Sequence, residues 1–314
     1  MYGYDNYQKV KEQLEKRRET AIMEAEARDA ELRIESPEIR QIDSELTGTG
    51  LLLFKTACAG GDLTAIKERN AALVKKRREV LKSLGYPEDY SEIKYSCPKC
   101  CDTGYVGNKI CSCFREALIK ENIRSSGIGN LIEKQSFDNF DLSIYEDENI
   151  REEMEYNLEE AKQYATEFSR NSNNLLLIGT TGTGKTHLTT AIAKTVIENG
   201  FEVLYDSAQN IVAAFEYDRF KSGYGQYEAR GEKYLECELL ILDDLGTEFS
   251  NQFTLSCIYN LLNTRLNKGL PTIISTNLGA GELLSRYEDR IYSRILGADT
   301  TVLHFLGKDK RLSR

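Results

Sequence analysis

The feature that most constrains the fold of this sequence is a glycine-rich run over residues 179–186, which reads Gly-Thr-Thr-Gly-Thr-Gly-Lys-Thr. The apolar run that precedes it, 174–178, is typical of a buried strand, and residues 186–198 have the pattern of a helix. Glycines let backbone N–H groups approach a phosphate without a Cβ in the way, and the following helix N-terminus adds partial positive charge. The order of strand, loop and helix therefore predicts a phosphate-binding loop of the form G-x-x-x-x-G-K-[ST].

This loop predicts which residues contact a nucleotide and its metal ion. Lys185 would place its ammonium group against the β- and γ-phosphates, and the hydroxyl of Thr186 would bind Mg²⁺. We therefore expect ATP with Mg²⁺ as the ligand and ATP hydrolysis as the reaction. The expected nucleotide-binding residues are those of the loop and the one after it, namely Gly179, Thr180, Thr181, Gly182, Thr183, Gly184, Lys185, Thr186 and His187.

From about Phe137 onward, short apolar runs alternate with amphipathic segments. The runs are Leu175–Ile178, Val203–Tyr205, Leu239–Leu242, Thr272–Ser275 and Thr301–Phe305. Continuous apolar strands separated by helices are typical of a parallel sheet that is covered on both faces. The predicted fold class is therefore α/β, with a P-loop NTPase core.

Two of these predicted strands end in polar side chains that suit phosphate chemistry. The run 238–242 ends in Asp243 and Asp244. We expect Asp243 to bind Mg²⁺ and Asp244 to polarise the attacking water, with Glu248 as an alternative base. Asn277 ends the next strand along the chain and is expected to hydrogen-bond the attacking water or the phosphate.

Five of the eight cysteines lie between residues 97 and 113. Cys97 and Cys100 form one close pair, and Cys111 and Cys113 form a second. Four thiolates suit tetrahedral Zn²⁺, and a closed site of four protein ligands is structural rather than catalytic. We predict a zinc module at about 95–115, with Cys101 as an alternative to Cys100. An iron–sulfur cluster and a set of unused thiols are the two competing interpretations.

Residues from about 5 to 84 are rich in Glu, Lys, Arg, Leu and Ala and are expected to be helical. A helix restart is predicted at Pro37, because proline is favoured at the first helical position. Gly60-Gly61 should break the chain before a third helix that begins near residue 62. The sequence leaves open whether these helices pack only on each other or also bind a partner protein.

A linker is expected at residues 125–129, which read Ser-Ser-Gly-Ile-Gly. We accordingly divide the chain into an N-terminal domain, residues 1–130, and an ATPase domain, residues 135–314. No run approaches the length of about 20 apolar residues that spans a bilayer, and the first residues lack the apolar core of a secretory signal. The chain is therefore expected to be cytoplasmic. Its net charge of −9 argues against bulk attraction to nucleic acid but allows a local basic strip.

The order of these motifs resembles the AAA+ ATPases, and more narrowly the bacterial replicative helicase loaders of the DnaC/DnaI type, with the IstB-type transposition helpers as relatives. The resemblance rests on residues 179–186, on 239–246 (LLILDDLG) and on 273–278 (IISTNL). It also rests on Phe137-Asp-Asn-Phe140 and on the cysteine cluster. It implies an AAA+ core preceded by a helical, zinc-binding domain.

The resemblance implies further roles for basic residues. Arg290 would act as an arginine finger on the γ-phosphate of a neighbouring subunit, and Arg311 would contact the nucleotide of its own subunit. Single-stranded DNA would be bound without sequence specificity. The expected strip of aromatic and cationic side chains is Tyr217, Arg219, Phe220, Lys221, Tyr224 and Tyr227.

The implied function is ATP-dependent loading of a replicative hexameric DNA helicase onto single-stranded DNA, with self-association through the ATPase domain. A transposition-helper ATPase of IstB type is the first alternative, and the zinc module disfavours it. A zinc-bearing adaptor that uses ATP only as a switch is the second, and the full set of Lys185, Asp243, Asp244, Asn277 and Arg290 disfavours it.

Overall fold

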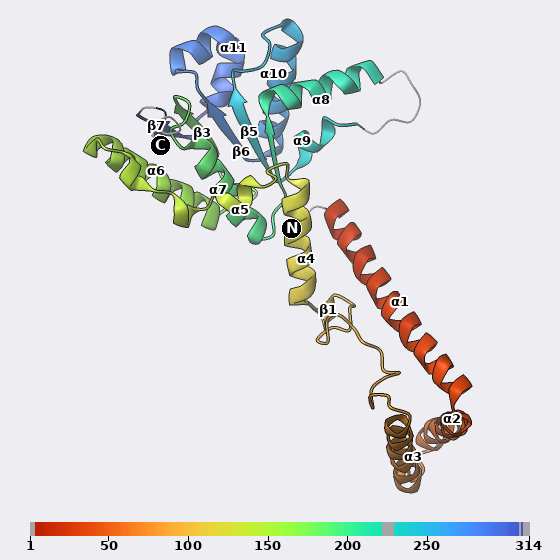
Figure 1. Ribbon diagram of the computed structural model, residues 1–314. Coiled ribbons are helices and arrows are strands. Elements are labelled where there is room, and N and C mark those ends of the chain that lie inside the picture. The colour runs from red at the N-terminus through yellow and green to blue at the C-terminus, as the bar shows by residue number, and fades with distance from the viewer. Residues whose placement is uncertain (1–3, 222–228, 308, 310–314) are drawn as a thin grey trace. The chain divides into compact units, whose positions relative to one another are not determined.

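The computed structural model of this protein describes residues 4–221, 229–307 and 309 (Figure 1). The chain divides into two compact units, one formed by Lys9–Arg115 and the other by Met1–Gln8 together with Glu116–Arg314. Helices α1 (Tyr4–Glu35) and α4 (Ser112–Ser125) each contribute residues to both units. In the described part of the chain, every helix is too short or too polar to cross a membrane.

The larger unit is built on a five-stranded parallel sheet in the order β4-β5-β6-β3-β7. The strands are β3 (Asn174–Gly179), β4 (Val203–Ser207), β5 (Leu239–Leu245), β6 (Thr272–Thr276) and β7 (Thr300–Phe305). The predicted parallel α/β sheet and its five strands are therefore confirmed. All neighbouring strands are parallel, so each connection must cross the sheet, and helices make these connections. The pairs β4-β5 and β5-β6 are consecutive in the chain, whereas β6-β3 and β3-β7 are not.

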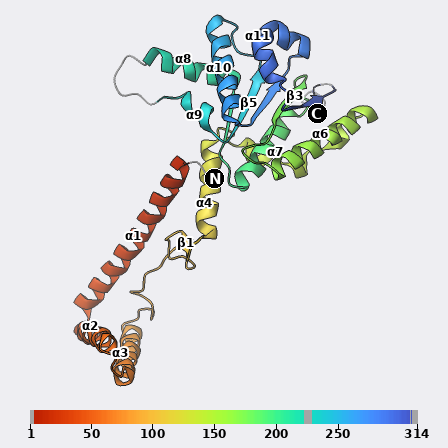
Figure 2. The same ribbon diagram turned by 180° about the vertical axis from the view of Figure 1, so that it is seen from behind.

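Helices cover both faces of this sheet, as Figures 1 and 2 show. Side chains alternate along a strand, so Leu175 and Leu177 of β3 face one layer and Leu176 faces the other. The first layer contains α6 (Glu148–Thr166) and α7 (Lys185–Glu198), and the second contains α8 (Ala208–Lys221), α10 (Gln252–Lys268) and α11 (Ala280–Ile295). Shorter elements are α5 (Leu131–Lys134), η1 (Phe137–Asn139), η2 (Leu142–Ile144) and α9 (Glu232–Glu236).

The segment expected to be a linker packs onto the sheet. The carbonyl of Ser126 accepts a hydrogen bond of 2.7 Å from the backbone N–H of Tyr205 in β4. Ser126 and Ile128 are buried, and a Cβ on Gly127 would lie 2.4 Å from the carbonyl oxygen of Tyr205. Gly127 also has φ +85°, a conformation that suits glycine. The segment thus lies against β4, because a Gly/Ser-rich composition allows close approach of two backbones, and its role as the link between two domains stays a prediction.

Three helices dominate the smaller unit. α2 (Pro37–Cys58) begins at Pro37, as predicted, and the backbone N–H of Ile39 donates to the Ser36 hydroxyl that caps this helix. α3 (Thr64–Ser83) packs against α2, which confirms the helical hairpin. Whether the hairpin also binds a partner protein stays a prediction.

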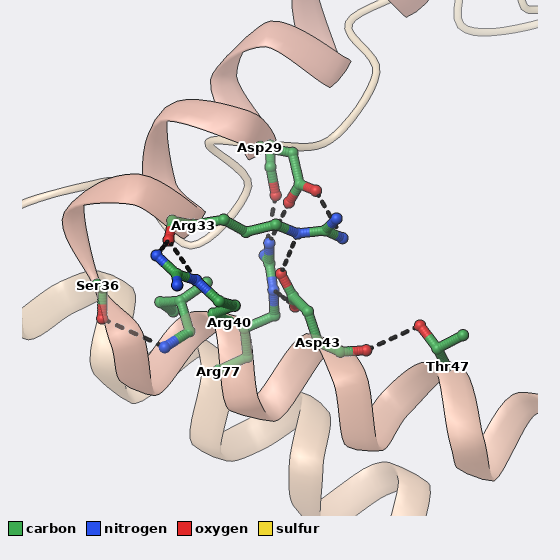
Figure 3. Close-up of polar contacts among 9 residues, drawn as sticks. Asp29, Arg33, Ser36, Arg40, Asp43, Thr47 and Arg77 are labelled. Carbon is green, nitrogen blue, oxygen red and sulfur yellow. Dashed lines mark hydrogen bonds and ion pairs between the residues drawn. The ribbon is translucent and has the colours of Figure 1, made fainter.

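An ion-pair network joins these helices (Figure 3). The guanidinium group of Arg77 on α3 contacts Asp43 of α2 at 2.7 Å and Asp29 of α1 at 2.7 Å. Arg33 of α1 contacts the same two carboxylates. Asp43 is buried, so removing Arg77 would leave a buried charge only partly compensated, a change that typically destabilises a fold strongly.

Candidate nucleotide-binding and metal sites

The phosphate-binding loop joins β3 to α7 and depends on two glycines with positive φ. Gly182 has φ +76° and Gly184 has φ +105°, and a Cβ on Gly184 would lie 2.9 Å from the Tyr145 hydroxyl. The buried Tyr145 supports the loop from behind, because its hydroxyl donates to the carbonyl of Thr183 at 2.8 Å. The loop is thus a rigid turn whose conformation only glycine supports at these positions.

The ammonium group of Lys185 lies inside this loop. Lys185 is only 5% exposed, and its Nζ donates to the carbonyls of Gly179 at 2.5 Å and Thr180 at 2.8 Å. It also donates to Oδ1 of Asn277 at 2.8 Å. Hydrogen bonds from this ammonium group to phosphate oxygens would join two charged groups and would therefore be stronger than those to carbonyl oxygens, which suits the position to an anionic ligand.

Asn277 connects the loop to the acidic strand end. Its Oδ1 accepts from Lys185, and its Nδ2 lies 3.4 Å from Oδ1 of Asp244. The backbone N–H of Asp244 donates in turn to the hydroxyl of Ser275 at 3.1 Å. Three of the predicted site residues, Lys185, Asn277 and Asp244, therefore form one hydrogen-bonded chain across the carboxyl ends of β3, β6 and β5.

A β-bulge separates the roles of the two adjacent aspartates. The register between β5 and β6 shifts between Leu242 and Leu245, and Asp244 has φ +53°. Such bulges redirect side chains and are frequent beside active sites.

Asp243 is only 7% exposed and accepts short hydrogen bonds from the hydroxyls of Ser275 and Tyr205. Burial, and then the neighbouring Asp243 carboxylate, raise the pKa of Tyr205, so its hydroxyl is a donor at neutral pH.

The donor set at this edge fits Mg²⁺. The carboxylate of Asp243 and the hydroxyl of Thr186 are hard oxygen ligands, which Mg²⁺ prefers together with phosphate oxygens and water. Thr186 lies in the first turn of α7, directly after Lys185. These two residues would hold the metal ion beside the bound phosphates.

Glu248 and His187 are occupied by other contacts. The carboxylate of Glu248 accepts from the Tyr287 hydroxyl at 2.5 Å and from the backbone N–H of Gly246 at 2.9 Å. His187 lies on the outer side of α7, where its Nε2 is 2.9 Å from the carbonyl of Ser136 and its ring packs on Phe140. Its contribution to nucleotide binding stays a prediction.

The predicted arginine finger lies on α11, which is kinked. Glu288 has φ 59° and ψ 169°, a conformation that is strained for any residue except glycine, and it interrupts the helix two residues before Arg290. Arg290 is exposed, whereas Arg294 is held by Asn263 at 2.9 Å and by the ring of Tyr259. Arg311, the predicted second arginine, lies outside the described residues.

Sulfur atoms of Cys97, Cys100, Cys111 and Cys113 all lie within 4.8 Å of one another. The distance is 3.8 Å for Cys97–Cys111 and 3.4 Å for Cys100–Cys113, close to the roughly 3.8 Å expected between sulfurs around tetrahedral zinc. Cys101 is exposed and is not part of this group. The backbone N–H of Cys100 lowers the pKa of the Cys97 thiol to about 7, which favours the thiolate that binds metal.

A buried carboxylate supports this cluster. Asp102 accepts from the backbone N–H groups of Ser96 at 2.8 Å and Cys97 at 3.0 Å. Arg17 of α1 pairs with the same carboxylate at 2.5 Å. Strands β1 (Tyr105–Val106) and β2 (Lys109–Ile110) form the hairpin between the two cysteine pairs. Sequence reasoning missed this role of Asp102, because it depends on Arg17, which is distant in sequence.

The predicted DNA-binding strip is only partly described. Phe220 on α8 is exposed, whereas Arg219 lies over the ring of Phe253 at 5.1 Å and Arg230 lies over the ring of Tyr217 at 3.8 Å. The strip residues Tyr224 and Tyr227 lie outside the described residues. DNA binding by this strip stays a prediction.

Three features lie at one edge of the parallel sheet ordered β4-β5-β6-β3-β7: the glycine loop after β3, the acidic end of β5 and the polar end of β6. Together they define a P-loop ATP-binding protein of the AAA+ class. A comparison with family models agrees with this class. The model of the IstB-like ATP binding proteins matches residues 129–299, more than half of the chain, and the chain belongs to that family.

Several known proteins are similar to this chain. The replicative helicase loader DnaC of Escherichia coli (strain K12) is 25% identical over 181 residues, which cover 58% of this chain and 71% of the relative. The phage-like element PBSX protein XkdC of Bacillus subtilis (strain 168) is 26% identical over 223 residues, which cover 67% of this chain and 81% of that protein. A crystal structure of DnaI has 22% identity and a TM-score of 0.45 over 58% of this chain and 93% of that one.

Proposed function

We propose that this protein hydrolyses ATP in a Mg²⁺-dependent reaction. The observation that carries the proposal is the hydrogen-bonded chain from Lys185 through Asn277 to Asp244. A bound triphosphate would take over the ammonium group of Lys185, and the metal ion held by Thr186 and Asp243 would neutralise phosphate charge. Asn277 is then placed to sense the γ-phosphate, because it contacts both the lysine and the candidate base.

Asp244 is the base in this proposal. Its carboxylate lies 3.4 Å from the side-chain amide of Asn277, which also contacts Lys185 of the phosphate-binding loop. Glu248 is only 3% exposed and is engaged by Tyr287 and Arg286, so its carboxylate holds α11 against the loop that follows β5. A general base must reach a water molecule near the γ-phosphate, and this geometry favours Asp244.

The process that we propose is the loading of a replicative hexameric DNA helicase onto single-stranded DNA, in the cytoplasm. Membership of the IstB-like family and similarity to the DnaC loader support it. The N-terminal helices would bind the helicase, and the ATPase units would self-associate, with Arg290 completing the site of a neighbour. The four-cysteine cluster would hold a structural zinc ion in the N-terminal part.

A transposition-helper role is the second candidate. It is favoured by the family itself and by a putative insertion sequence ATP-binding protein of Sinorhizobium fredii, which is 34% identical over 35% of this chain. This role would require binding to duplex DNA and to a transposase.

One experiment separates the two candidates. ATP hydrolysis by the full chain is measured with single-stranded DNA or with duplex DNA of the same length and sequence, each with and without purified hexameric helicase. A loader should be stimulated by single strands and should change its rate when the helicase is added. Stimulation by duplex DNA alone, with no response to the helicase, would reject the loader in favour of the transposition helper.

A further inference from the structure

Both carboxylate oxygens of Asp243 are engaged by hydroxyl groups from the two neighbouring strands. Oδ1 accepts from Ser275 of β6, and Oδ2 accepts from Tyr205 of β4. These strands flank β5 on either side in the sheet. The carboxylate that would bind Mg²⁺ is therefore held in one orientation from both sides.

The main chain at Tyr205 is itself fixed. Its backbone N–H donates to the carbonyl of Ser126 at 2.7 Å, and Gly127 packs against its carbonyl oxygen so closely that a Cβ would lie 2.4 Å away. The residue is also in regular parallel pairing, opposite Ile241 of β5. The backbone of Tyr205 is thus fixed by β5 on one side and by residues 126–127 on the other, and this backbone positions the hydroxyl that contacts Asp243.

We propose that Tyr205 is a positioning residue for the metal-binding carboxylate of Asp243. A carboxylate that uses one oxygen for a metal ion needs a donor on the other oxygen to fix its rotation, and removing such a partner typically lowers metal affinity by about 10- to 100-fold. The proposal rests on the proposed function, because it takes Asp243 as the Mg²⁺ ligand. It assigns to β4 a part in metal binding that the motifs on β3, β5 and β6 do not include.

The test is binding of a fluorescent ATP analogue to the full-length chain, measured while Mg²⁺ is titrated and again in EDTA. In Tyr205→Phe, the Mg²⁺ concentration needed for half of the metal-dependent gain in binding should rise by about tenfold or more. Nucleotide binding in EDTA should be unchanged, because the phosphate-binding loop is intact. A purely structural role would change both measurements or neither.

Tyr234 supplies a matched control. It is a buried tyrosine whose hydroxyl donates to a carboxylate on β4, that of Asp206, at 2.6 Å. Tyr234→Phe removes an equivalent hydrogen bond away from Asp243 and should leave the Mg²⁺ titration unchanged. An equal shift in both variants would overturn the proposal, since any lost tyrosine hydroxyl would then have the effect.

A double variant tests the path through Asp243. In an Asp243→Asn background, Tyr205→Phe should produce no further shift in the Mg²⁺ titration, and a further shift of tenfold would overturn the positioning role. Failure of the proposed function is a distinct outcome. If the wild-type chain binds nucleotide equally with and without Mg²⁺, Asp243 is not a metal ligand and both proposals fall. If the wild type depends on Mg²⁺ and Tyr205→Phe retains this dependence, only the role of Tyr205 is overturned.

Discussion

Two acidic residues close to each other in sequence, Asp244 and Glu248, have different surroundings. The Asp244 carboxylate lies 3.4 Å from the amide of Asn277, which itself accepts from Lys185. The Glu248 carboxylate is buried against Tyr287 and the backbone of Gly246. Two acidic residues separated by only three others therefore differ in surroundings: Asp244 lies beside Asn277, and Glu248 fastens a helix.

This difference predicts the outcome of two isosteric substitutions. Asp244→Asn should retain ATP binding but slow hydrolysis by about 100-fold or more, because general-base catalysis typically contributes 10²- to 10⁴-fold. Steady-state hydrolysis and equilibrium binding of an ATP analogue provide the measurements. Glu248→Gln serves as the control: its amide oxygen can still accept from Tyr287, and it should hydrolyse ATP at nearly the wild-type rate. The assignment would be reversed if Glu248→Gln lost hydrolysis and Asp244→Asn kept it.

Individual site residues differ in how far the sequence reveals them. The sequence reveals those that lie at or just after the end of an apolar run, namely Lys185, Asp243, Asp244 and Asn277. Tyr205 and Ser275 are equally polar and equally near strand ends, but nothing in their spacing points to Asp243. Their role depends on the strand order β4-β5-β6, because only neighbouring strands can supply a hydroxyl to β5. Sequence order does not determine which strands are neighbours, and this is why reasoning from the sequence missed both residues.

Among the secondary-structure elements, the cysteine hairpin has the least apolar support. β1 and β2 contain two residues each, and both residues of β2 are exposed. The two strands pair only with each other, and the four clustered cysteines lie before and after them in the chain. Elements of this size usually require a metal ion to fold, since the free energy of metal binding becomes free energy of folding.

Metal analysis of single cysteine variants tests this hairpin. The wild-type chain should contain about one zinc ion, and Cys97→Ser should lose it because a tetrahedral site needs all four ligands. Released zinc can be measured with a chromogenic chelator. Cys101→Ser is the control, because Cys101 neighbours the site but is exposed and outside the cluster, and this variant should retain its zinc. Iron in place of zinc, or zinc retained by Cys97→Ser, would contradict the assignment.

Elements of the sheet were the easiest to predict. The inner strands β3, β5 and β6 are continuous apolar runs because both of their faces are largely buried, whereas the outer strands β4 and β7 are only partly buried. The predicted runs differ from the observed strands by only a few terminal residues. The kink in α11 could not be predicted, since Glu288 is an ordinary helix former and its strained conformation is imposed by tertiary contacts. Contacts of Arg286 and Tyr287 with Glu248, immediately before the kink, are the observed constraint.

For the molecule as a whole, the exposed position of Arg290 leads to a mixing experiment. Arg290→Ala should bind nucleotide normally but hydrolyse it poorly, because the finger would act on the site of a neighbour. Lys185→Ala should be unable to hydrolyse ATP in its own nucleotide site, but it retains a functional Arg290. Mixing the two inactive proteins should therefore restore part of the hydrolysis rate. Arg294→Ala is a useful comparison, since Arg294 is held by Asn263 and Tyr259 within its own subunit.

The outcome of mixing distinguishes two arrangements. A hydrolysis rate per Arg290→Ala chain that rises as Lys185→Ala protein is added indicates an arginine supplied between subunits. If the folded proteins show no recovery at any ratio, Arg290 does not complete a neighbouring site.

The domain boundary between residues 130 and 135 stays a prediction. The compact unit that holds the sheet includes residues from Glu116 onward.

The contact between Ser126 and Tyr205 has a consequence for solubility. β4 is an outermost strand of the sheet, and an uncovered outer strand presents unpaired N–H and C=O groups that other chains can pair with. The segment 126–128 covers that edge, with the Ser126 carbonyl on the Tyr205 N–H and Ile128 buried beside it. A fragment of residues 135–314 would uncover the edge and should self-associate through β4, whereas a fragment of residues 116–314 should not. Light scattering of the two fragments at equal concentration would measure this difference, and equal scattering would show that the edge of β4 needs no cover.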